Sequence, residues 1–353
     1  MGEVINGIQQ IGIGVHNAKE VFNWYRKYLG FDILLFKDKA TATLMANYTG
    51  GIAQRRNAYL SLNMLGGGGL EIWQYKSRKP QKPLTPMVWG DLGINAMKVR
   101  SSNLKDTLKK LQSSNLKAVG SIEKGDNEGD SFKFVDPWGN FVVVVEDSYY
   151  FSKTSLATGG VLGAVIGVSN METSLNFYKN LLGYTNVLLD QTIVLDSKIF
   201  KETSKKYRRL VLAHERKHIG GFGELLGPTQ IELIQALEYT PKRIFEDRFW
   251  GDLGYIHLCF DVQGMIMLRE KAEKLGYGFT VDSANSFHMG DAAGHFSYVE
   301  DPDGTLIEFV ETHKVPILKK LGLYLDLQSR DPLKPLPKWL VKALKLHKVT
   351  KDL

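Results

Sequence analysis

An internal repeat constrains this chain more than any other feature, because repeated units fold alike and pack on one another. The segment GIGVHNAKEVFNWYRKYLGF (12–31) is echoed by IGVSNMETSLNFYKNLLGY (166–184). Each copy reads as a short apolar strand, an Asn turn, an amphipathic helix and a helix-ending Leu-Gly-aromatic sequence. The same structural unit is therefore expected twice.

Two shorter motifs mark the same repeat. WGDLG and an Asp-Pro-x-Gly turn each occur twice, at 89–93 and 250–254 and at 136–140 and 301–305. An alternating apolar strand and then a further helix, at 103–116 and 265–277, follow the WGDLG motifs. Because the order of strand, helix and strands thus recurs within each copy, the chain is expected to contain four half-modules.

The repeat sets the expected domain organisation. Residues 1–150 form a first module, residues 160–312 a second, and the polar stretch 147–160, which ends in paired glycines, reads as a linker. Residues 313–353 form a basic tail with a helix near its end. The predicted fold class is α+β: four βαβββ half-modules in two tandem domains, followed by this tail.

Charge is concentrated in that tail. Residues 313–353 carry ten basic and three acidic residues, which accounts for the whole net charge of +7. The body is neutral, so a nucleic-acid partner is not expected. In the tail, Trp339, Leu340, Ala343, Leu344 and Val349 can form one helical stripe. We expect this stripe to pack on the protein body or a second subunit, in preference to an anionic membrane.

Other features fit an ordinary soluble protein. The chain has no apolar run long enough for a membrane span, and MGEVINGI lacks the features of a signal peptide, so a cytoplasmic location is expected. Its only cysteine, Cys259, lies in the apolar run YIHLCFDV and is expected to be buried.

The fourfold unit, its LGF or LGY helix ends and DPDGTLIEF (301–309) together resemble the vicinal oxygen chelate superfamily of glyoxalases, bleomycin-resistance proteins and extradiol dioxygenases. The resemblance covers residues 5–312. It implies that each half-module curls a sheet and that two half-modules close a cup around a divalent metal ion. The ligands would come from the first and last strands of each half-module.

The resemblance assigns a first-strand and a last-strand position to each half-module. In chain order the pairs are Gln10 and Glu71, Ala96 and Val143, Ala164 and Glu232, and His257 and Glu308. If the first half-module pairs with the fourth, which we favour, Gln10, Glu71, His257 and Glu308 share one site. If contiguous halves pair, as in extradiol dioxygenases, Glu232 joins His257 and Glu308 instead. His257 and Glu308 belong to the site in both cases.

A set of two carboxylates, one amide oxygen and one imidazole suits Zn, Ni or Mn acting as a Lewis acid. The resemblance therefore implies a glyoxalase-like lyase or isomerase acting on a small molecule with adjacent oxygens, with Glu71 or Glu308 as the base. Tyr298 stands where extradiol dioxygenases carry a catalytic tyrosine. We expect a monomer or homodimer whose partner is the small-molecule substrate.

Two alternatives stay open. An Fe(II) ring-cleaving dioxygenase needs two histidines and one carboxylate, so His288 or His295 would have to complete the site; His214 and His218 are weaker metal candidates. A metal-free, resistance-type protein would only hold a ligand in the cup. Glyoxalase I binds glutathione through an Arg and an Asn at positions that here are Gly14 and Tyr75. Glutathione is therefore not expected as a cosubstrate.

Overall fold

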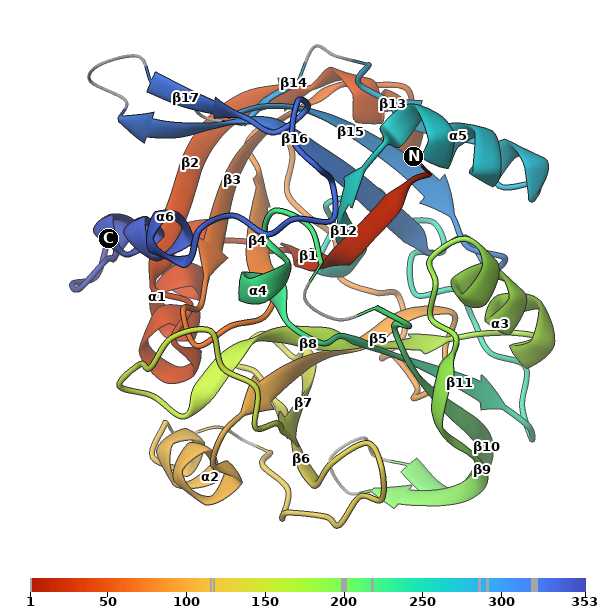
Figure 1. Ribbon diagram of the computed structural model, residues 1–353. Coiled ribbons are helices and arrows are strands. Elements are labelled where there is room, and N and C mark those ends of the chain that lie inside the picture. Colours follow the sequence, from red (N-terminus) through yellow and green to blue (C-terminus); the bar gives the residue numbers. More distant parts are fainter. Residues whose placement is uncertain are drawn as a thin grey trace.

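Two curled β-sheets with helices packed against them make up the molecule (Figure 1). The computed structural model describes residues 2–353 except 115, 117, 198–201, 217–218, 285–286, 290–291 and 319–322. The predicted α+β class is confirmed. Among the described residues, no helix is both long enough and apolar enough to cross a membrane.

The larger sheet has ten strands, nine from the first and fourth half-modules and one from the tail, in the order β13-β15-β16-β12-β1-β4-β3-β2, with β14 beside β15 and β17 beside β16. The first half-module supplies β1 (Val4–Gly14), β2 (Ile33–Ala42), β3 (Gln54–Leu62) and β4 (Gly69–Tyr75). The fourth supplies β12 (Gly254–Gln263), β13 (Val281–Asp282), β14 (Phe287–Met289), β15 (Ala292–Glu300) and β16 (Leu306–Leu318). The tail adds β17 (Leu323–Asp326).

The smaller sheet has seven strands from the second and third half-modules, in the order β6-β7-β5-β8-β11-β10-β9. These are β5 (Gly93–Ser101), β6 (Ser131–Val135), β7 (Phe141–Glu146), β8 (Thr158–Gly167), β9 (Asn186–Ser197), β10 (Glu202–Ala213) and β11 (Gln230–Ala236). In the second half-module, isolated bridges from Val119 to Phe134 and from Glu123 to Ser131 precede β6 where a full strand was expected.

The pairing of half-modules follows the arrangement that we favoured from the sequence. β1 runs antiparallel to β12, and β5 runs antiparallel to β8. The first half-module therefore pairs with the fourth and the second with the third, and the alternative of contiguous pairing is wrong. Each sheet takes one half from each copy of the repeat, so the two copies are tied together by both sheets.

The main helices begin where the repeat predicts. They are α1 (Ala18–Leu29), α2 (Leu104–Gln112), α3 (Met171–Asn180) and α5 (Met265–Lys274). Asn17 caps α1 by accepting from the Glu20 amide, and Asn170 caps α3 in the same way from Thr173. Gly30 ends α1 with φ of 73°, a left-handed conformation that favours glycine. The Asn turns and Leu-Gly ends of the sequence are thus helix start and stop signals.

The tail departs from the expectation of one helical stripe. β16 continues as a strand to Leu318, and the helix is short: α6 (Lys338–Lys342) leads into a 3₁₀ turn, η3 (Ala343–His347). Leu340 is buried, whereas Trp339 is 66% exposed, so the predicted stripe is wrong as a single face. The tail does pack on the body: Lys348 forms an isolated antiparallel β-bridge with Ile33, and the Val349 amide donates to the Asp32 carbonyl.

Candidate metal centre

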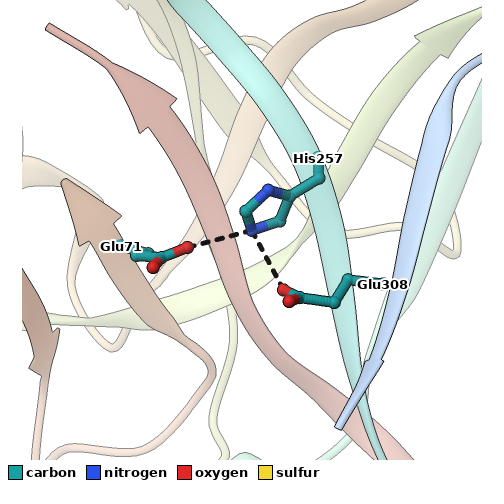
Figure 2. A group of neighbouring side chains, drawn as sticks. All are labelled: Glu71, His257 and Glu308. Carbon is teal, nitrogen blue, oxygen red and sulfur yellow. Dashed lines mark ion pairs between the residues drawn. The ribbon is translucent and has the colours of Figure 1, made fainter. Parts of the chain in front are cut away.

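Three ligand-type side chains from three different strands meet on the inner face of the ten-stranded sheet. Nε2 of His257 on β12 lies 3.2 Å from Oε2 of Glu71 on β4 and 3.2 Å from Oε2 of Glu308 on β16. Figure 2 shows the imidazole pointing between the two carboxylates. We call this inner face the first cup and these three residues the triad. Their ligand atoms all lie within 4.8 Å of one another.

The backbone of β1 makes this meeting possible. β1 lies between β4 and β12, and Gly12 is the Cα partner of both Glu71 and His257. A Cβ atom at Gly12 would collide with the His257 ring. Glycine at this position therefore lets the histidine ring lie over β1 and come within 3.2 Å of Glu71 on β4.

Burial makes the triad electrostatically incomplete. His257 is fully buried, and the side chains of Glu71 and Glu308 are only 13% and 10% exposed. Nδ1 of His257 has no hydrogen-bond partner among the described residues, and Nε2 lies 3.2 Å from an oxygen of each carboxylate. Burial opposes protonation of His257, but Glu308 and Glu71 outweigh it and raise its pKa. Burial likewise raises the pKa of Glu308, against the effect of His257. Both shifts follow from the burial of two carboxylates and one imidazole side by side.

Gln10 completes the set of predicted ligands. Its Nε2 lies 3.4 Å from Oε2 of Glu71 and 3.4 Å from Oε2 of Glu308, and its Oε1 is buried without a hydrogen-bond partner in the described structure. The two ends of an amide are interchangeable in shape. Rotation of the amide would turn the unpartnered oxygen towards the triad, where a cation would be.

Aromatic side chains wall the triad. Trp250 stacks on His257 with ring centroids 6.0 Å apart, and Tyr298 meets His257 edge-on at 5.7 Å. Tyr298 is also the cross-strand partner of Glu308 and interacts with its carboxylate, while burial raises the pKa of the phenol. Cys259 is buried, as expected, and follows His257 on the same face of β12. The wall excludes water, which strengthens electrostatic interactions inside it.

Glu232 does not join the triad. It lies on β11 in the seven-stranded sheet, where Oε2 accepts from Nζ of Lys98 at 2.8 Å and Oε1 accepts from Nε of Arg209 at 2.6 Å. Arg209 also donates to Glu128 at 2.8 Å. These two cations hold the pKa of Glu232 well below its usual range in spite of burial. We call this inner face the second cup.

The other three positions that the resemblance assigned are Ala96, Val143 and Ala164, whose side chains cannot bind a metal ion. Ala96 and Val143 belong to an apolar cluster that lines the second cup. Ala164 instead packs into the main core between the sheets and helices, and Val165 is the residue that faces Glu232 across the strands. The assignment of Ala164 to the inner face is therefore wrong by one residue.

The other histidine candidates lie elsewhere. Nε2 of His295 is 2.5 Å from Asp282, which also pairs with Arg269 of α5, so His295 lies on the side of the sheet that the helix covers. His214 is buried at Gly183 and bonds to the backbone of Arg216. The side chain of His288 and all of His218 lie outside the described residues.

Sequence reasoning missed the cations of the second cup. Lys98 is 1% exposed, and Arg209 lies on the neighbouring strand β10. A signal was present, because Lys98 interrupts the buried strand GINAMKVRS and buried lysines are almost always paired. The same reasoning would have found Arg100, whose buried guanidinium pairs with Asp147 at 2.6 Å.

Comparisons with known proteins agree with this architecture. Residues 160–309 match the family model of the Glyoxalase/Bleomycin resistance protein/Dioxygenase superfamily. A Bacillus subtilis protein described as a "putative dioxygenase" has a similar structure, with 14% identity, 99% of both chains covered and a TM-score of 0.58. Glyoxalase I from Zea mays is similar with 13% identity over 88% of this chain and 93% of that one, with a TM-score of 0.54. A search of curated proteins finds no match. Residues 160–309 therefore belong to the Glyoxalase/Bleomycin resistance protein/Dioxygenase superfamily, and the chain as a whole has its fold.

Proposed function

We propose that the first cup binds a divalent metal ion and that the protein is a metal-dependent enzyme of the vicinal oxygen chelate type. The observation that carries the proposal is the triad itself. Two largely buried carboxylates and one imidazole converge, and Nδ1 of His257 makes no hydrogen bond within the described structure. Glu71, His257, Glu308 and Gln10 Oε1 would hold the ion. A buried acceptor set of this kind is stable only when a cation or a proton lies at its centre.

The chemistry that we propose is proton transfer, as isomerisation or a lyase step, on a small substrate with two adjacent oxygens. When bound, the metal ion supplies Lewis-acid polarisation of the chelated carbonyl. Glu71 or Glu308 would take the proton from the neighbouring carbon as a general base. Glu71 is the more exposed of the two carboxylates, which favours it for contact with a substrate. Trp250 and Tyr298 would exclude water from the reacting atoms.

The surroundings favour a substrate other than a glutathione conjugate. Tyr75 donates its hydroxyl hydrogen bond to the Trp250 carbonyl and packs on Trp73. A side chain at Gly14 would collide with the backbone of Asp252. The positions at which glyoxalase I carries an Arg and an Asn are thus used for packing in this protein.

Metal analysis and oxygen uptake test the proposal together. Protein purified without a tag should contain Zn, Ni or Mn, and turnover of a panel of 2-oxoaldehydes should proceed without oxygen. Glu308→Gln should lose metal and turnover, Glu71→Gln should lose turnover and keep metal, and Glu146→Gln, an exposed strand residue, serves as the matched control.

Two other outcomes would replace this function. Bound iron with stoichiometric oxygen uptake on catechols would identify a ring-cleaving dioxygenase. Absence of any metal binding, with a small molecule held in the cup, would identify a binding protein. The triad contains one histidine and two glutamates, which argues against the usual Fe(II) set of two histidines and one carboxylate.

A further inference from the structure

The C-terminal tail packs on the same face of the sheet as the triad. Leu60 on β3 is the cross-strand partner of Glu71, so Leu60 and, two residues later, Leu62 point to the inner face. Leu62 is in one apolar cluster with four buried tail residues: Leu327, Leu336, Leu340 and Val341. Part of the first cup is therefore filled by side chains from the chain end.

A second segment joins the tail in covering this face. The Leu336 amide donates to the Gly221 carbonyl at 2.9 Å, in the turn before α4 (Gly223–Leu226). The neighbouring Gly220 lies against Asn6, whose amide donates to Asp261 at 2.7 Å. Asp261 is on the same face of β12 as His257. Figure 1 shows the tail crossing this side of the sheet near α4.

The other side of the cup is closed by residues that belong to the sheet or its connecting loops. Trp73, Tyr75, Trp250 and Tyr298 form one buried aromatic cluster around the triad. Opening this side would disturb the core of the sheet. Residues 327–341, by contrast, belong to no strand, and helix α6 at the end of this segment has only five residues. They can leave the inner face while Val349 stays bonded to Asp32 and β1 stays paired with β4 and β12.

We propose that residues 327–341 form a strap that closes the first cup and must lift before a ligand reaches the triad. The role of the strap in ligand access rests on the proposed function. Its opening can be measured without metal or substrate. Leu336, Leu340 and Val341 hold the strap down. The exposed tail residues Trp339 and Leu346 do not contribute to this contact, since they are 66% and 89% exposed.

The only cysteine of the chain provides the measurement. Cys259 is buried and lies on the His257 face of β12, between His257 and Asp261. The rate at which methyl methanethiosulfonate modifies this thiol in metal-free protein therefore reports how often the inner face opens. Leu340→Asp should raise the rate at least about tenfold through local opening, and Leu340→Ala should raise it less. Leu346→Asp, in the same tail but exposed, should label at the wild-type rate.

A control separates strap opening from general loss of stability. Leu111→Ala empties a buried position on α2, in the main core and outside the cluster that holds the tail. If labelling tracks the free energy of unfolding equally in Leu111→Ala and Leu340→Ala, the strap is refuted. A folded Leu340→Asp variant that labels at the wild-type rate also refutes it. Failure of the wild-type protein to bind Zn or Ni would overturn the proposed function instead, and would leave the labelling result valid.

Discussion

In the first cup, Glu71 and Glu308 both lie 3.2 Å from Nε2 of one histidine, whereas in the second cup Glu232 lies between Lys98 and Arg209. Both cups come from the same repeated half-module and both bury carboxylates on the inner face. The two cups differ in what compensates the charge of these carboxylates. The second cup neutralises its carboxylate with side chains of the chain itself, and the first leaves a position for a positive charge.

This difference shows that one fold can surround a buried carboxylate either with a histidine and a second carboxylate or with two cations. A buried carboxylate requires a compensating charge. Lys98 lies on β5, which pairs with β7 and β8 in the seven-stranded sheet. Its ammonium group donates directly to Glu232. The ten-stranded sheet has the uncharged Cys259 as the partner of Glu308. A few side-chain identities on equivalent strands therefore decide whether a cup contains its own counter-charge.

The largest expected effect concerns metal affinity. His257→Ala removes the nitrogen ligand that we propose and should weaken binding of Zn or Ni by at least about 100-fold, more than the usual loss of an outer-shell partner. Glu232→Gln should leave the affinity within about threefold, because distant sites act independently. Titration of metal into the metal-free protein, recorded by calorimetry, measures the affinity of both variants. Equal losses of metal affinity in the two variants would contradict the difference between the two cups.

The next effect concerns stability. Glu232→Gln leaves Lys98 buried without a counter-charge and should lower the free energy of unfolding by about 3–5 kcal/mol. The double variant Lys98→Met with Glu232→Leu should return to within about 1 kcal/mol of the wild-type protein, since Arg209 keeps Glu128 as a partner. Urea unfolding with a chelator present provides the comparison. In the first cup, Glu308→Gln should cause no such loss in metal-free protein; a comparable loss there would contradict the comparison.

The smallest effect is the dependence of stability on pH that Asp261 contributes in the first cup. Burial raises the pKa of Asp261 to about 7, above its value in the unfolded chain. The folded state therefore binds the proton more tightly, and the stability from this group is lost as pH rises through 7. The expected loss between pH 6 and pH 8 is about 1 kcal/mol. Asp261→Asn should reduce the loss of stability between the two pH values by this amount in urea unfolding, while Glu238→Gln, an exposed control, should leave the loss unchanged.

The sequence alone determined the repeat, the helix boundaries and the residue types of the triad. Asn17 and Gly30 are local signals, because a helix cap acts within one turn of its helix. The burial of Cys259 followed from its apolar strand. His257 and Glu308 were expected to share a site under either pairing, and the structure brings them together.

Only the tertiary structure decided which half-modules pair, what neutralises Glu232 and where the tail lies. Alternating strands show which side chains share a face, but they do not show which strand edges meet when the partners are as far apart as Gln10 and Cys259. Lys98 and Arg209 come from separate strands that meet Glu232 only after both sheet contacts form. The tail pattern allowed one helical stripe, but the chain buries Leu340 and exposes Trp339, because packing against the inner face replaces helical periodicity once the helix is shorter than two turns.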